Sequence, residues 1–483
     1  MKVLQGGQPG EARGANARRI ASNTALIIVL RCGIAAVHVA IVALLARALG
    51  PAGYGVWSTA IAYVGIFSIL IDLGLAQAAT QRMSAEPERE PEWLGAFVMT
   101  RTAVSVFLLA VCLAGVPLLA RSGDLRLVTL VLSVTILTGV PNSLMAVFES
   151  RLRPGPGLAL TALEAVILLG AVGTLTFAGT GILGYALAFV AAALVVGVAR
   201  LLFLRHFARV ALRRGVKLWR PLMRLALPLG IAGVLVAIYY RIDVVLIFNL
   251  RGAEEAGIYG AAYRFLDPLH LLPQAVLASL FPVLSAAHGR DPARLGRLVQ
   301  NGIDYSAIIS LPMLGGSIVA AGPLVDFLLG DGFERAAGLV PILMVAFVSI
   351  CYGYLAGYLA AIVGLQWRYA AYAAVGAVAN VALNLILIPP YGAYGAAWVT
   401  AVTEVTTMSL LLATVLRALQ FRPSLARPLR AALAAAAMVV PMALAAPAGL
   451  LVTLLVGVGV YVLVLIAVRG VVPSELLALA RKS

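Results

Sequence analysis

Long apolar runs follow one another along almost the whole of this 483-residue chain. A helix that crosses a bilayer needs about 20 mostly apolar residues. The chain is 62% hydrophobic and only 12% charged, whereas soluble domains carry about 25% charged residues. It is therefore a polytopic, all-α integral membrane protein. We predict about fourteen transmembrane helices, at residues 21–46, 55–80, 93–120, 127–148, 157–179, 181–204, 222–249, 255–285, 303–330, 337–364, 369–389, 393–416, 429–447 and 449–468.

The basic residues alternate from one side of these spans to the other. Of the 36 Lys and Arg side chains, 27 lie in or beside the two termini and the segments that follow even-numbered spans, and 5 lie on the other side. Cytoplasmic segments carry such an excess, so both termini are predicted to be cytoplasmic. The net charge of +16 thus reflects topology, and we expect no nucleic-acid partner. The basic, amphipathic segment 205–221 is predicted to bind anionic membrane lipid.

Two internal matches indicate a duplicated six-helix unit. Gly55-Val56-Trp57 recurs as Gly257-Ile258-Tyr259, and the Gly181–Ala186 hexapeptide has a counterpart at Gly392–Ala397. Six is even, so the repeats are parallel, and transporters built from repeats bind substrate where the repeats meet. The predicted architecture is two parallel six-helix lobes around a central cavity, plus two C-terminal helices that look lipid-facing. The predicted divisions are a cytoplasmic tail (1–20), an N-lobe (21–204), a basic linker (205–221), a C-lobe (222–419) and a C-terminal part (420–483).

Charged side chains inside the two helices predicted between residues 222 and 285 point to function. A charge near the bilayer centre costs about 2.5 to 3.5 kcal/mol even on insertion scales, so it should face protein or a water-filled cavity. In the second of these helices a single polar face holds four side chains, with Arg264 at its edge. In the first helix Arg241 projects roughly 160° away from Asp243, so the two cannot pair within it. The four side chains of the polar face are Tyr263, Asp267, His270 and Gln274.

Further polar side chains lie in other spans. Arg31 and His38 are seven residues apart and share one face of the first span, while Asn380 and Asn384 are i, i+4 neighbours in the eleventh. Asp72 is expected to pair locally. For each of these residues the alternative to a functional role is interhelical hydrogen bonding that only holds helices together.

Motifs for catalysis are absent from the sequence. It contains no G-x-x-x-x-G-K-[ST], H-E-x-x-H, G-x-S-x-G or C-x-x-C. The three cysteines lie far apart in apolar runs, which favours neither a disulfide framework nor a metal site. We therefore expect a non-enzymatic protein without a cofactor, a catalytic residue or a bound metal.

A series of short motifs resembles the polysaccharide-biosynthesis flippases of the multidrug/oligosaccharidyl-lipid/polysaccharide exporter superfamily. In chain order the motifs are ARALGPAGYGVW, DLGL, RIDVVLI, GIYGAAYRF, FPVLS and NVALNLILIPPYGAYGAAW. The resemblance implies two lobes that alternate between inward- and outward-open states in a bacterial cytoplasmic membrane. It implies a substrate in which an oligosaccharide, such as an O-antigen or exopolysaccharide repeat unit, is linked to undecaprenyl pyrophosphate. A polysaccharide polymerase and glycosyltransferases are the protein partners that it implies.

The candidate residues follow from this resemblance and from their chemistry. Arg31, Arg241 and Arg264 are predicted to bind the anionic headgroup, because guanidinium binds phosphate bidentately and stays charged. Coupling to H⁺ or Na⁺ is assigned to ionisable side chains in the spans, among which His270 has an unperturbed pKa near neutral pH. The coupling candidates are Asp243, Asp267, His270 and Glu404. The candidates for sugar contact and cavity lining are Tyr239, Tyr240, Tyr259, Tyr263, Gln274, Asn380 and Asn384.

Three alternatives stay open at this level. A lipid II flippase is disfavoured, since the arginine-rich first-helix pattern is absent. A cation-coupled multidrug exporter on the same fold would need a net negative cavity, but three arginines against Asp243, Asp267 and Glu404 balance to zero. A membrane scaffold without transport leaves the costly midplane charges unexplained.

Overall fold

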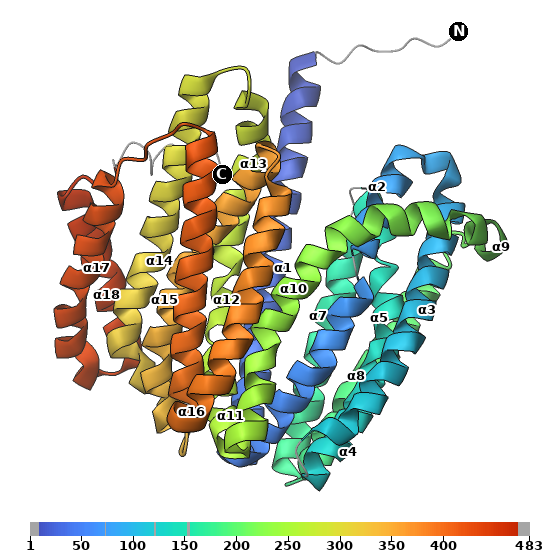
Figure 1. Ribbon diagram of the computed structural model, residues 1–483, viewed down its shortest axis with the longest axis horizontal. Helices are drawn as coiled ribbons and strands as arrows, with labels where there is room; N and C mark the ends of the chain where they lie inside the picture. Colours follow the sequence, from blue (N-terminus) through green and yellow to red (C-terminus); the bar gives the residue numbers. More distant parts are fainter. Residues whose placement is uncertain (1–8, 73, 120–121, 152–154, 472–483) are drawn as a thin grey trace.

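The computed structural model describes residues 9–72, 74–119, 122–151 and 155–471, the side chains of 9–28, 143, 149, 228–240 and 278 excepted. Within these residues every regular element is a helix, as the sequence predicts. Figure 1 shows two helical bundles that meet at one end of the molecule and diverge toward the other. The all-helical membrane fold with two lobes is confirmed.

The first lobe contains α1 to α8, and a short linker helix, α9, follows it. The bounds are α1 (Pro9–Asp72), α2 (Leu75–Ala85), α3 (Glu90–Gly115), α4 (Gly123–Ser133), α5 (Thr135–Ser143), α6 (Ala146–Ser150), α7 (Gly155–Phe177), α8 (Ile182–Leu204) and α9 (Leu212–Gly215).

The second lobe begins with α10 and is followed by the C-terminal pair. The bounds are α10 (Trp219–Arg251), α11 (Ala253–Tyr263), α12 (Leu266–Leu269), α13 (Leu271–Ala287), α14 (Pro292–Leu329), α15 (Glu334–Ile362), α16 (Gln366–Ala418), α17 (Ala426–Ala445) and α18 (Leu450–Ala467).

Two of the long helices double back on themselves at a glycine. Gly50 (φ 63°) interrupts α1 and Gly392 (φ 57°) interrupts α16, each in the left-handed region that glycine adopts without steric cost. A straight 53-residue helix would be about 80 Å long against a hydrocarbon core of about 30 Å. Figure 1 shows that the chain reverses direction within α1 and again within α16. In the described residues eleven helical segments are long and apolar enough to span a membrane, two of them containing these reversals; the total of fourteen stays a prediction.

Three predicted spans are not single helices, which corrects the sequence interpretation. The second is divided between α1 and α2, the fourth among α4, α5 and α6, and the eighth among α11, α12 and α13. In the eighth span Pro268 and Pro273 have no N–H to donate to the carbonyls four residues earlier, so the helix breaks there. Arg264 thus lies at the break between α11 and α12, and Asp267 lies on the four-residue α12.

The basic linker is packed against the first lobe. The Ala211 amide donates to the Pro91 carbonyl (2.9 Å) at the start of α3. A Cβ on Gly95 would lie 2.5 Å from the Ala211 carbonyl oxygen, so the two backbones touch. This contact holds α9 and the beginning of α10 at the end of the molecule where the lobes diverge (Figure 1).

Candidate functional site: a cavity between the lobes

A cavity of about 1060 Å³ lies between the two lobes. Its walls come from α1, α7 and α8 of the first lobe and from α11 to α15 of the second, and α17 and α18 close one side. The C-terminal pair therefore contributes to the cavity, which corrects the prediction that these helices only face lipid.

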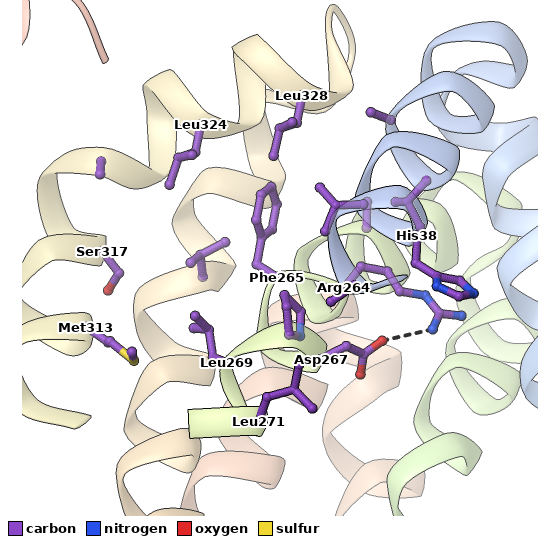
Figure 2. A pocket seen from close by; sticks show the side chains of 18 of the residues that line it. His38, Arg264, Phe265, Asp267, Leu269, Leu271, Met313, Ser317, Leu324 and Leu328 are labelled. Atoms are coloured by element: carbon purple, nitrogen blue, oxygen red, sulfur yellow. Dashed lines mark hydrogen bonds and ion pairs between the residues drawn. The ribbon is translucent and has the colours of Figure 1, made fainter. Parts of the chain in front are cut away.

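The cavity wall carries three charged side chains, Arg31, Arg264 and Asp267, and the imidazole of His38. Arg31 and His38, both exposed, project from the same face of α1, as their seven-residue spacing predicts. Arg264 Nη1 donates to Asp267 Oδ2 (2.9 Å), and Figure 2 shows this pair beside His38. The Nδ1 atom of His38 lies 2.8 Å from the Ile34 carbonyl oxygen, so the other ring nitrogen is left for the cavity.

Arg241 approaches this group from α10 but does not line the cavity. A Cβ on Gly65 would lie 2.7 Å from Arg241 Nη1, so the guanidinium packs on the bare backbone of α1. Arg31 and Arg264 thus share the cavity, whereas the Arg241 guanidinium packs against α1 outside the cavity wall.

Asp243 lies in a separate, closed polar cluster inside the second lobe. Its side chain is only 2% exposed. It accepts hydrogen bonds from Asn384 Nδ2 (2.8 Å), Thr400 Oγ1 (2.9 Å) and Tyr259 Oη (3.0 Å). The Asn380 amide oxygen accepts a further bond from Asn384 (3.0 Å). A buried carboxylate needs such donors because desolvation otherwise disfavours its charge.

This cluster corrects three predictions. Tyr259, Asn380 and Asn384 were expected to line the cavity for sugar contact, but they are 1%, 0% and 0% exposed. Tyr259 of α11 and Asn384 of α16 both bond to Asp243, and Asn380 bonds to Asn384. Arg241 and Asp243 point in different directions, as the helical geometry predicts.

The remaining candidates are dispersed along the second lobe. Gln274 is exposed and donates to Tyr354 Oη (2.8 Å), which lies 3.3 Å from His270 Nδ1. The Tyr263 and Tyr259 rings lie 5.9 Å apart. Glu404 is 1% exposed and lies inside the lobe, away from the cavity wall. The side chains of Tyr239 and Tyr240 lie outside the described residues.

Several buried charges were missed in the sequence analysis. Arg200 (3% exposed) pairs with Glu164 (2.8 Å) and donates to Thr161, a residue of the cavity wall. In the second lobe Asp304 pairs with Arg427 (3.6 Å). The signal available was a carboxylate within each apolar span. Asp72 pairs with Arg101 of α3 (2.5 Å), so its partner comes from another helix and is not local in the sequence.

With this geometry established, similarity to known proteins places the chain in a family. The model of a family described as "Polysaccharide biosynthesis protein" matches residues 20–288. The chain belongs to this family. This membership confirms the resemblance seen in the motifs.

Relatives of this polysaccharide biosynthesis protein include two named transporters. The "Putative O-antigen transporter" of Shigella flexneri is 21% identical over 320 residues, which cover 63% of this chain and 75% of the relative. The "Succinoglycan biosynthesis transport protein ExoT" of Rhizobium meliloti (strain 1021) is 26% identical over 332 residues, or 66% of this chain and 65% of the relative.

Solved structures share the fold of this polysaccharide biosynthesis protein. "Lipid II flippase MurJ, inward closed conformation" matches with a TM-score of 0.67 at 15% identity, covering 90% of this chain and 97% of that one. An inward-facing multidrug resistance MATE family transporter of the MOP superfamily matches at 0.61 and 16% identity, covering 81% and 93%. At these identities the likeness shows the fold alone, so it does not choose between the two activities.

Proposed function

We propose that this polysaccharide biosynthesis protein is a flippase, which translocates an undecaprenyl-pyrophosphate-linked oligosaccharide across a bacterial cytoplasmic membrane by alternating access. The supporting observation is that one cavity joins a charged wall to an apolar one. Beyond the charged group, its surface is formed by apolar side chains of α14, α17 and α18. These include Met313, Leu324, Met438, Met442, Leu454 and Val458.

Charge separates this proposal from the multidrug-exporter alternative. Counted from the sequence, the candidate arginines and carboxylates cancel. The structure removes Asp243 and Glu404 from the cavity by burying them, so Arg31 and Arg264 face only Asp267 on its wall. A net positive wall suits a pyrophosphate and disfavours an organic cation. An apolar wall beside it suits a polyprenyl chain, because burial of such a chain is favourable in proportion to its area.

Reconstitution of the full chain in proteoliposomes tests the proposal. A fluorescent undecaprenyl-pyrophosphate-linked oligosaccharide in one leaflet should become accessible to a membrane-impermeant glycan-modifying enzyme in the other. Ethidium loaded into the same vesicles should not be exported. Ethidium export without movement of the lipid-linked oligosaccharide would favour the multidrug exporter instead.

Orientation and peripheral partners form a second part of the proposal. Both termini and the 205–221 linker lie on the cytoplasmic side, where the linker binds anionic lipid. Its exposed basic residues Arg213, Arg214 and Lys217 stand beside Phe207 and Trp219, which are 50% and 44% exposed. Basic and aromatic side chains together suit the headgroup region. A polysaccharide polymerase and glycosyltransferases are the protein partners proposed from the family resemblance.

Cysteine labelling should verify the orientation. In a cysteine-free background, Val210→Cys in the linker should react with an impermeant maleimide only after the cells are permeabilised. Ala178→Cys, exposed in the α7–α8 loop, should react in intact cells and serves as the control. Labelling of position 210 in intact cells would reverse the proposed topology.

Coupling to H⁺ or Na⁺ is proposed to involve the Asp243 cluster before the other candidates. Its carboxylate can take up a proton, and carboxylate and hydroxyl oxygens are the kind of ligand that hard cations prefer. Asp267 is 49% exposed and forms an ion pair with Arg264. This pairing explains its charge without any role in ion coupling. His270 and Glu404 remain further candidates for coupling.

Asp243→Asn should abolish the dependence of translocation on a Na⁺ or pH gradient, because it removes the charge and keeps the shape. The expected cost in folding stability is about 1 to 3 kcal/mol, since one of the donors around Asp243 loses its acceptor. Translocation measured with and without each gradient checks this expectation. Asp304→Asn, at another buried carboxylate that is 1% exposed, is the matched control and should keep the dependence. An unchanged gradient response in Asp243→Asn would assign Asp243 to structure alone.

A further inference from the structure

Where the two lobes meet, α1 and α11 touch through a reciprocal pair of glycines. A Cβ on Gly55 would lie 1.7 Å from the Ala253 carbonyl oxygen, and a Cβ on Gly257 would lie 1.9 Å from the Pro51 carbonyl oxygen. The two glycines occupy equivalent positions in the sequence repeat. The repeats thus face each other through bare backbone, with no side chain between them.

The corner of α1 at Gly50 is also enclosed by the turn between α14 and α15. A Cβ on Gly332 in this turn would lie 3.0 Å from Pro51 Cγ. The ring of Tyr54 meets that of Phe333 edge-on, with centroids 6.0 Å apart. Both rings are buried. The corner of α1 therefore packs into the second lobe, against the turn between α14 and α15.

Arg47 crosses this seam from the first lobe to the second. Its Nε donates to the Leu328 carbonyl oxygen (3.2 Å) and its Nη2 to that of Phe327. These carbonyls belong to the last turn of α14, which ends before Gly330 (φ 77°). The last carbonyls of a helix have no partner within it and carry partial negative charge, so a cation there is stabilising.

The contact lies next to the cavity wall. Leu45 on α1 and Leu328 on α14 both line the cavity, and so does Tyr54. Arg47 follows Leu45 by two residues and bonds to the backbone of Leu328 itself. The two bundles meet at this end (Figure 1), so opening the cavity here would part α1 from α14 and break the bonds of Arg47.

We propose that Arg47 is a latch that holds this end of the cavity closed and sets the balance between inward-open and outward-open states. The proposal rests on alternating access, which is part of the proposed function. Because both partner carbonyls belong to the second lobe, loss of the guanidinium removes a contact between lobes and leaves the hydrogen bonds within each lobe in place.

Distances between spin labels test the latch without any substrate. Labels at Ala178→Cys and Ala448→Cys, both exposed, report the separation of the lobes at this end in detergent or nanodiscs. Arg47→Ala should raise the ratio of long to short distances by about fivefold, the upper range for one cation at an exposed helix C-terminus. Arg47→Lys should give a smaller rise, because the ammonium still donates to a carbonyl.

Arg126→Ala is the matched control. Arg126 also caps carbonyls near this end, those of Pro117 (3.1 Å) and Leu119 (3.4 Å), but both lie in its own lobe. In Arg126→Ala the distances between the two spin labels should equal those measured without this substitution. An unchanged distribution in Arg47→Ala, or an equal shift in Arg126→Ala, would overturn the latch. The distances could shift as expected while the lipid-linked oligosaccharide is not translocated. That result would support the latch and contradict the proposed substrate.

Discussion

The double variant Arg31→Ala/Arg264→Ala is expected to lose at least about 99% of translocation of the lipid-linked oligosaccharide. Loss of one charge-assisted guanidinium contact with phosphate costs about 1.5 to 3 kcal/mol, or roughly tenfold to a hundredfold in affinity. The two side chains line the same cavity, Arg31 from α1 and Arg264 from the break between α11 and α12, one from each lobe. Leaflet-resolved accumulation of the substrate, at matched membrane levels of protein, measures the loss.

Two controls separate binding from structure in this experiment. Arg31→Lys/Arg264→Lys keeps both charges but loses the planar fork, and should retain part of the activity. Arg368→Ala/Arg422→Ala removes the same charge from exposed positions and should translocate normally. Normal translocation by the double alanine variant would end the headgroup assignment, and its absence from the membrane would show that the arginines are structural.

Gly257→Ala should prevent the lobes from closing at the Gly55–Gly257 contact. The added Cβ would lie 1.9 Å from the Pro51 carbonyl oxygen, whereas real Cβ contacts essentially never fall under 3.0 Å. Overpacking of this kind costs about 1 to 3 kcal/mol, which lowers the ratio of closed to open forms by roughly fivefold to 150-fold. The spin-label pair at positions 178 and 448 should report mostly the long distance, and translocation should fall in parallel.

Glycines elsewhere in the lobes offer a matched control for this substitution. Gly173 in α7 has no atom within 4 Å of its Cβ position, so Gly173→Ala should change neither distance nor translocation. Alanine favours helix by about 1 kcal/mol over glycine, so Gly257→Ala should still insert and fold. If the distance between the labels at 178 and 448 stays short in Gly257→Ala, the backbone contact between α1 and α11 is not needed to close the lobes.

Much of the fold could be predicted from the sequence because the bilayer imposes local constraints. Apolar length predicts the spans, and helical periodicity places Arg31 and His38 on one face, as observed. The breaks at α12 and α13 were missed, although Pro268 and Pro273 are visible in the sequence. Their effect was underestimated because a membrane helix tolerates proline where neighbouring groups compensate for the lost hydrogen bond.

The sequence by itself determined the membrane fold, the alternating charge, the parallel repeat and the family. Only the tertiary structure decided which charges meet. Asn384 reaches Asp243 from 141 positions away, and this removed both Asp243 and two predicted sugar contacts from the cavity. Periodicity orients a side chain relative to its own helix axis, but it carries no information about which distant helix packs on that face. The same holds for Gly55 and Gly257, whose repeat is legible in the sequence but whose contact exists only because the two lobes pack against each other there.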